Sequence, residues 1–151
     1  MFKHILIPTD GSPLSNEAIA AGIELAKVAG AKVTGFFAAP APTPVIYQHF
    51  IPVGYLAPEE HAAMIERAAR QYLTVLENAA RSAGVECELE HATNDFPAEA
   101  IIDAAKKKNC DLIFMASHGH RGRRGVLLGS VTREVLAHAT IPVLIFRMGA
   151  A

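Results

Sequence analysis

The chain has 151 residues, of which 51% are hydrophobic and 19% are charged, values typical of one globular domain with its own core. Lysine and arginine number 14 and the acidic residues 15, so the net charge is −1, which argues against a nucleic-acid partner. The N-terminal apolar stretch is too short for a signal peptide and no run is long enough to cross a membrane, so we expect a cytoplasmic protein with no membrane partner.

The first part of the chain predicts a strand, a helix and a second strand. His4–Pro8 is a short apolar run typical of a buried strand. Ser12 and Pro13 mark the start of a helix that reaches Ala29, because serine caps helices well and proline suits their first position. Ala31–Ala38 predicts the second strand. The apolar face expected for the helix consists of Leu14, Ala18, Ala21, Leu25 and Val28.

Residues 39–60 contain prolines at positions 40, 42, 44, 52 and 58 and therefore predict a long irregular connection. The segment is also rich in apolar residues, among them Tyr47, Phe50 and Tyr55. Such a composition predicts packing against the domain or against another subunit. We interpret the segment as a proline-rich insertion at about 39–58 and not as a domain boundary.

The remaining pattern predicts three helices and three strands in alternation. The first helix ends at Gly84, the second begins at Pro97 and the third begins at Ser130. The strands are expected at Val85–His91, which is half exposed, at Asp111–Ala116, which is buried on both faces, and at Ile141–Arg147. The face of the first helix should be Ile65, Ala69, Leu73, Leu76 and Ala80. Strict alternation predicts an α/β three-layer sandwich, an open five-stranded parallel sheet with helices on both faces.

Ligands of such sheets bind beyond the carboxyl ends of the strands. Asp10 is the acidic residue that directly follows the first strand. Its carboxylate is suited to accept hydrogen bonds from ribose hydroxyls or to hold a metal ion. The alternative role is to cap the turn or the following helix.

The connection from Ser117 to Gly129 has thirteen residues, which is long for a link between a strand and a helix. Gly129 and Ser130 stand where the next helix presents unpaired N–H groups and the positive end of its dipole, as a phosphate site requires. Neither G-x-x-x-x-G-K-[ST] nor G-x-G-x-x-G after the first strand occurs, which excludes the standard P-loop and nicotinamide-binding motifs.

Other polar residues of this connection leave alternatives open. Arg121, Arg123 and Arg124 are suited to pair with phosphate oxygens, and equally to a solvated loop. His118 and His120 form an H-x-H pair, which without a third ligand nearby is a weak metal signal. Ser117 and His118 are adjacent, a spacing that disfavours proton transfer between them, so we predict no catalytic residue. Cys87 and Cys110 lack C-x-x-C spacing and are expected to be buried free thiols.

Several blocks of sequence resemble the universal stress protein family over nearly the whole chain. They are ILIPTDGS at the first strand, FPAEAIIDAA at the third helix, CDLIFMASHGHRG at the fourth strand, and LLGSVTREVLAHATIPVLIFR to the end. The resemblance implies a single universal stress protein domain over residues 1–151. It also implies the strand order 3-2-1-4-5 of the adenine-nucleotide alpha hydrolase-like fold.

Members of that family that bind ATP are recognised by G-x2-G-x9-G-[ST] at the end of the fourth strand. Here Ala116 replaces the first glycine, whereas Gly119, Gly129 and Ser130 keep their places. The resemblance therefore implies ATP, with Mg²⁺ or Mn²⁺ carried by the nucleotide. It assigns the phosphates to Gly119, Gly129, Ser130, Val131 and Thr132. It assigns the adenosine end to Pro8, Thr9, Asp10 and Ala38, with Ala116 and His118 beside the ligand.

The family also implies a homodimer formed through the last strand, Val143–Phe146. An apolar strand left at the edge of a sheet would itself favour such pairing. The implied function is a nucleotide-binding stress-response or signalling dimer with an unidentified protein partner. Two alternatives remain open at this point: a dimeric scaffold that binds no nucleotide, and a very slow ATPase.

Overall fold

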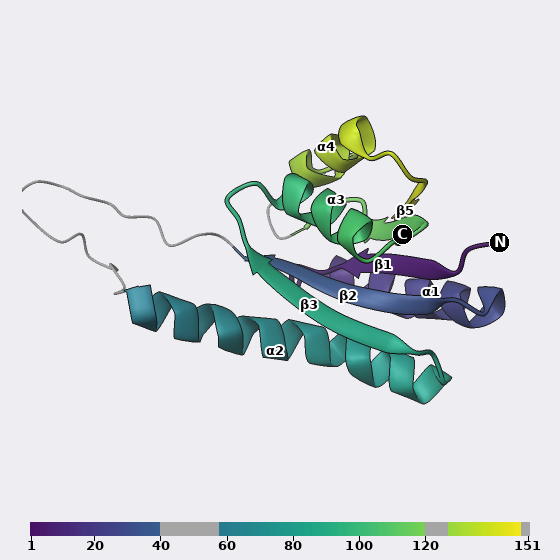
Figure 1. Ribbon diagram of the computed structural model, residues 1–151, viewed down its shortest axis with the longest axis horizontal. Helices are drawn as coiled ribbons and strands as arrows, with labels where there is room; N and C mark the ends of the chain where they lie inside the picture. Colours follow the sequence, from purple (N-terminus) through teal and green to yellow (C-terminus); the bar gives the residue numbers. More distant parts are fainter. Residues whose placement is uncertain (40–57, 120–126, 149–151) are drawn as a thin grey trace, which may run out of the picture.

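A computed structural model describes residues 1–39, 58–119 and 127–148. The predictions for residues 40–57 and for His120, Arg121, Arg123 and Arg124 lie outside these ranges. The described residues form one parallel sheet of five strands in the order β3-β2-β1-β4-β5 (Figure 1), which confirms the expected order. The strands are β1 (His4–Pro8), β2 (Lys32–Ala39), β3 (Cys87–Thr93), β4 (Leu112–Ala116) and β5 (Val143–Phe146), and the helices are α1 (Pro13–Ala29), α2 (Pro58–Ala83), α3 (Pro97–Lys107) and α4 (Ser130–His138).

Two hydrophobic cores lie on opposite faces of the sheet. Ile5 and Ile7 of β1 belong to the core shared with α1 and α2, and Leu6 between them belongs to the core shared with α3 and α4. Figure 1 shows α3 and α4 on one side of the sheet and α2 on the other. The three-layer sandwich is thus confirmed. At the carboxyl edge of the sheet, the neighbouring strands β1 and β4 end side by side.

The elements on both sides of the predicted connection extend further than predicted. Ala39 still belongs to β2, where it is paired with Thr93 of β3. At the other end, α2 already begins at Pro58, because proline lacks only an N–H that the first turn of a helix does not use. The predicted third strand is also shifted, since β3 runs from Cys87 to Thr93 and not from Val85.

The predicted face of α1 is partly confirmed, because Ala18 is buried and Leu14, Ala21 and Leu25 pack against the core. Val28 is 88% exposed, whereas the buried positions are Ser15, Ala18, Ile19, Gly22, Ile23 and Ala26. A small residue is required at position 22 because the helix lies close against the sheet there: a Cβ built on Gly22 would be 2.7 Å from Cδ1 of Ile7 and 3.0 Å from Cδ1 of Phe114. The predicted face of α2 is confirmed, with all five residues buried.

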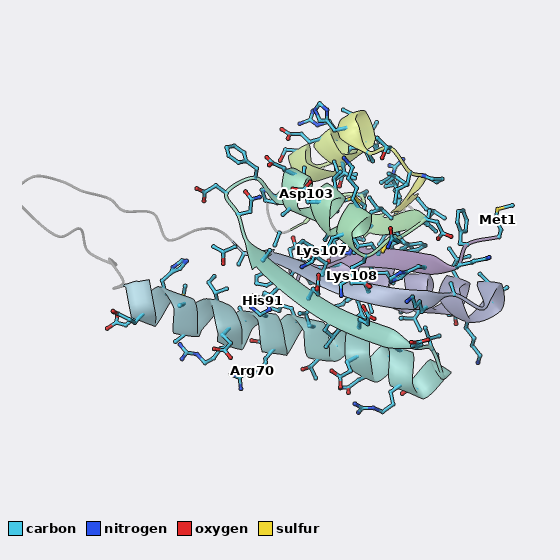
Figure 2. The ribbon with its side chains drawn as sticks, in the orientation of Figure 1. Met1, Arg70, His91, Asp103, Lys107 and Lys108 are labelled. Carbon is cyan, nitrogen blue, oxygen red and sulfur yellow. The ribbon has the colours of Figure 1, made fainter. Side chains whose placement is uncertain are left out.

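The sheet is paired unevenly around its central strand. The register of β1 with β2 runs over all five residues of β1, but its register with β4 covers only Ile5 and Leu6. Gly22 of α1 touches Ile7 of β1 and Phe114 of β4, so α1 spans this junction. At the other edge of the sheet, Lys108, which follows α3 and is labelled in Figure 2, forms ion pairs with two residues of β3. Its Nζ lies 3.2 Å from Oε2 of Glu88 and 3.1 Å from Oε1 of Glu90.

The two cysteines are free thiols without a catalytic environment. Cys110 is buried and Cys87 is partly buried. Burial raises the pKa of each thiol to about 11, so both are neutral at physiological pH. No helix within the described ranges is long and apolar enough to cross a bilayer.

Candidate functional site

The turn between β1 and α1 holds Asp10 in a fixed orientation. Oδ1 of Asp10 accepts a hydrogen bond from the backbone N–H of Ser12 at 2.9 Å. Ser12 in turn caps α1, because its Oγ accepts from the N–H of Ser15 at 3.2 Å. Gly11 between them has φ of 79°, a conformation that glycine adopts without strain. The capping role considered for Asp10 is therefore present, and it uses one of the two carboxylate oxygens.

The other oxygen of Asp10 faces the chain that follows β4. A Cβ built on Gly119 would collide with Oδ2 of Asp10. Asp10 and Gly119, 109 positions apart in sequence, are thus in contact at the carboxyl edge, where the sheet changes its winding direction. Glycine at position 119 is explained by this close approach, and a carboxylate stands where ligands of doubly wound sheets bind.

The two ends of the long connection are tied together. The backbone N–H of Gly129 donates to the carbonyl of Ser117 at 2.7 Å, and the N–H of Ser117 donates to the carbonyl of Phe146 at 2.9 Å. A Cβ on Gly129 would lie 3.1 Å from Cα of His118. The start of α4 is therefore packed directly against the residues that end β4.

The N-cap residue of α4 has no side chain that could cap the helix. Gly129 is the N-cap residue, and within the described ranges it makes no side-chain capping bond. The N–H of Arg133 donates to the carbonyl of Gly129 at 3.0 Å, which closes the first helical turn. The N–H groups of Ser130, Val131 and Thr132 precede that bond, so they have no partner within the helix. They form the positive end of the helix dipole.

Thr132 contributes differently from its neighbours in α4. Its hydroxyl donates to the carbonyl of Ala116 at 3.0 Å, and the residue is only 2% exposed. This hydrogen bond joins α4 to β4 and uses the hydroxyl of Thr132 in the fold. At the end of the helix, Thr132 therefore offers only its backbone N–H. Sequence reasoning gave no signal for this contact.

Ala116 occupies an ordinary strand conformation. Its residue partner in β5 is Phe146, and its methyl group belongs to the core on the α1 side of the sheet. Among the described non-glycine residues a positive φ occurs at Asn109, so Ala116 is not in a backbone conformation that favours glycine. Replacing the first glycine of the motif therefore introduces no backbone strain.

Ser117 and His118 contact each other, contrary to the expectation from their adjacency. Oγ of Ser117 lies 3.2 Å from Nδ1 of His118. Ser117 is only 3% exposed, so its hydroxyl is not accessible as a nucleophile. Across the described part of the chain, no group of three or more His, Cys, Asp or Glu side chains is arranged to hold a metal ion.

The remaining predicted residues line the same edge. Pro8 and Thr9 are buried where β1 ends, and the N–H of Thr9 donates to the carbonyl of Phe36 at 2.9 Å. Ala38 stands further along β2 towards the carboxyl edge, partly buried beside Ala92 of β3. The structure thus brings Asp10, Gly119, Gly129 and the start of α4 to one edge, with Pro8, Thr9 and Ala38 on its β1–β2 side.

The sequence profile of the Universal stress protein family matches residues 1–147. The chain belongs to the universal stress protein family. Among its relatives, universal stress protein YxiE of Bacillus subtilis is 31% identical over 159 residues, which cover 97% of this chain and 100% of that protein. Universal stress protein MJ0531 of Methanocaldococcus jannaschii is 33% identical over 150 residues, covering 97% and 83%.

Solved structures of universal stress proteins have the same fold. One in complex with cAMP has a TM-score of 0.68 at 21% identity and covers 98% of this chain and 99% of that one. The Archaeoglobus fulgidus protein in complex with dAMP has a TM-score of 0.65 at 20% identity, covering 97% and 98%. An Arabidopsis thaliana member with AMP bound has a TM-score of 0.64 at 19% identity, covering 98% and 93%.

Proposed function

We propose that this universal stress protein binds an adenine nucleotide at the carboxyl edge of its sheet and acts as a stress-response homodimer. The observation that carries the proposal is the contact of the Asp10 carboxylate with Gly119, next to the uncapped start of α4. Family membership and the structural neighbours that hold cAMP, dAMP or AMP support an adenine nucleotide. ATP is the proposed ligand, because the backbone groups along this edge suit several phosphates.

The proposed roles follow from which groups each residue has left to offer. Gly119, Gly129, Ser130 and Val131 would bind phosphate oxygens through backbone N–H groups, as would the N–H of Thr132. Nδ1 of His118 is engaged with Ser117, so Nε2 is the ring nitrogen for a phosphate.

The ribose and the base belong at the β1–β2 side in this proposal. Asp10 would accept hydrogen bonds from ribose hydroxyls, Pro8 and Thr9 would support the nucleoside, and Ala38 would meet the base through its backbone. Ala116 lies behind this surface, with its methyl group in the core.

A divalent ion would be bound mainly through the phosphates. The donor set of the described residues fits this arrangement, because Asp10 brings one carboxylate and no cluster of three acidic, histidine or cysteine side chains surrounds it. Mg²⁺ keeps several waters and commonly binds one carboxylate together with substrate phosphates. The ion would neutralise phosphate charge, and the residues themselves would orient the nucleotide.

Titration calorimetry with Mg-ATP and with AMP tests the proposal. The decisive pair of variants is Gly129→Glu and Gly129→Gln, which have the same shape and differ in charge. A carboxylate about 4 Å from a phosphate costs about 4 kcal/mol at an effective dielectric constant of about 20. We therefore expect Gly129→Glu to bind Mg-ATP at least about 100-fold more weakly than Gly129→Gln.

Two results would count against nucleotide binding. Equal affinities of the Glu and Gln variants for Mg-ATP would show that no phosphate binds at the start of α4. Absence of binding by the wild-type chain, with no adenine nucleotide released on denaturation, would leave the dimeric scaffold as the function. Production of ADP by the wild-type chain would instead identify the very slow ATPase.

The homodimer is proposed through β5, an edge strand whose Leu144 is 37% exposed. Unpaired N–H and C=O groups along such an edge favour pairing with a second copy. Light scattering coupled to size exclusion should give a dimer mass for the wild type and a monomer mass for Leu144→Lys. A monomeric wild type would contradict this part of the proposal.

A further inference from the structure

A cavity of about 360 Å³ lies beside the start of α1, at the β4–β5 side of the carboxyl edge. Three segments line it: the first turns of α1, the residues around the connection after β4, and the residues after β5. The lining residues are Pro13, Leu14, Glu17, Ser117, His118, Leu127, Arg147 and Met148. Its volume falls in the range of small-molecule sites, about 300 to 1,000 Å³.

The cavity lies where the face of the sheet that carries α1 is incompletely covered over β5. Leu144 and Phe146 of β5 are paired with Phe114 and Ala116 of β4, whose side chains belong to the core on the α1 side. Over β5 that face is less covered, since Leu144 is 37% exposed. Leu127 and Met148, which line the cavity, are 66% and 59% exposed. The cavity therefore has partly exposed apolar walls.

This cavity adjoins the proposed phosphate site. Ser117 and His118 both line it, and both also contact Gly129, through the 2.7 Å hydrogen bond to the carbonyl of Ser117 and the packing of Gly129 on Cα of His118. One layer of chain thus separates the cavity from the start of α4. A group attached to the terminal phosphate of a nucleotide bound at α4 would therefore reach the cavity by passing Ser117 and His118.

The charged residues of the cavity indicate what kind of group fits. Arg147 offers a guanidinium, which suits a phosphate, and Glu17 offers a carboxylate, which repels phosphate and accepts hydrogen bonds from hydroxyl groups. Neither side chain takes part in the ion pairs formed within the described ranges. Together with the apolar Leu14, Leu127 and Met148 they suit a nucleoside, which has a hydroxyl-bearing sugar and an apolar base face.

We propose that this cavity is a second subsite of the nucleotide site and binds the distal nucleoside of a dinucleoside polyphosphate. The inference rests on the proposed function, because the first nucleoside and the phosphates occupy the site at Asp10, Gly119 and Gly129. In this arrangement Arg147 binds the distal phosphate, Glu17 accepts from the distal ribose hydroxyls, and the apolar walls cover the distal base.

Diadenosine tetraphosphate and ATP are the probes, measured by titration calorimetry on the wild-type protein in the presence of Mg²⁺. Both probes present adenosine and a phosphate chain, and only the first has a second nucleoside. We expect diadenosine tetraphosphate to bind about tenfold more tightly than ATP, which corresponds to one or two additional hydrogen bonds.

The variants are Glu17→Trp, which fills the cavity and removes its carboxylate, and Glu24→Trp as the matched control. Glu24 is an exposed residue of the same helix that does not line the cavity. Glu17→Trp should lose the tenfold advantage of diadenosine tetraphosphate and keep its affinity for ATP. Glu24→Trp should behave as the wild type with both probes.

The possible failures are distinguishable. If the wild type binds ATP and diadenosine tetraphosphate equally, the second subsite is refuted while nucleotide binding stands. If the advantage exists but survives Glu17→Trp, the distal nucleoside lies elsewhere and the assignment of this cavity is wrong. If neither probe binds, the proposed function fails first.

Discussion

Replacing Gly119 with alanine tests whether the two loops at the carboxyl edge form one unit. The added Cβ would collide with Oδ2 of Asp10, so the carboxylate has to turn away. That rotation removes Oδ1 from the N–H of Ser12, to which it is bonded at 2.9 Å. The lost hydrogen bond should therefore lower the free energy of unfolding by about 1 kcal/mol, the net contribution of one such bond.

In an Asp10→Ala background the same substitution meets no carboxylate. Gly119 is not among the described glycines with positive φ, so alanine fits its backbone. Alanine also restricts the unfolded chain, which stabilises a protein by roughly 0.4 to 1 kcal/mol. This gain is present in both backgrounds and cancels in the double-mutant cycle, which should give a coupling energy of about 1 kcal/mol between positions 10 and 119.

Urea unfolding followed by far-ultraviolet circular dichroism measures the four proteins of this cycle, provided that their m-values agree. Gly30→Ala is the control, because Gly30 has φ of 67° and nothing within 4 Å of its built Cβ. Its cost comes from the backbone alone and should be the same with or without Asp10. An equal cost of Gly119→Ala in both backgrounds would refute the contact between the loops.

Three further predictions concern stability, each measured by the free energy of unfolding in urea. Burial lowers the pKa of His4 below the usual value of about 6.5, so the unfolded chain binds the proton more readily than the folded one. Stability present above about pH 6.5 is therefore lost as the pH falls towards the pKa of the folded state. His4→Gln should make the free energy of unfolding less dependent on pH in this range. Thr132→Val removes the hydroxyl bonded to the buried carbonyl of Ala116 and should cost about 1 to 3 kcal/mol; an unchanged value would mean that the carbonyl finds another partner. Ser12→Ala removes the cap of α1 from the N–H of Ser15 and should cost about 1 kcal/mol, whereas Ser12→Gly should cost only a few tenths.

Local signals were sufficient for most of the fold. The apolar run at His4–Pro8 is the fully buried central strand β1. Ser12 caps α1 as predicted, and Gly30 ends it in the left-handed conformation. These features depend on residues close in sequence, where capping chemistry and glycine conformations act directly. Strand order came from the family resemblance, since alternation alone defines the layers and not the order.

Apolar periodicity predicted the buried face of α1 only in part, giving Ala18 and the partly buried Leu14, Ala21 and Leu25. Ser15 and Gly22 are buried there although neither counts as apolar, and Val28, which does, is 88% exposed. Close approach of the helix to the sheet selects for small side chains, a requirement that exists only once Ile7 and Phe114 are in place. Periodicity therefore placed the helix correctly but missed its small buried residues and the exposure of Val28.

The candidate site was only partly accessible from the sequence. The spacing of Gly119, Gly129 and Ser130 pointed to the edge at which the structure brings their segments together, because glycines and a helix start are local signals. The contact of Asp10 with Gly119 and the bond from Thr132 to Ala116 join distant segments. Glu17 and Arg147 belong to different elements and carry no motif, so the cavity they share emerges only from the fold.

The short pairing of β1 with β4 has a mechanical consequence for the domain. The register there covers two residues of β1, against five towards β2, so the shortest register of the sheet separates the halves β3-β2-β1 and β4-β5. Gly22 of α1 packs across that division on one face, and the meeting of Asp10 with Gly119 bridges it at the carboxyl edge. A ligand held by both loops would add a further tie between the halves and slow amide hydrogen exchange throughout the sheet, beyond the loops that it touches.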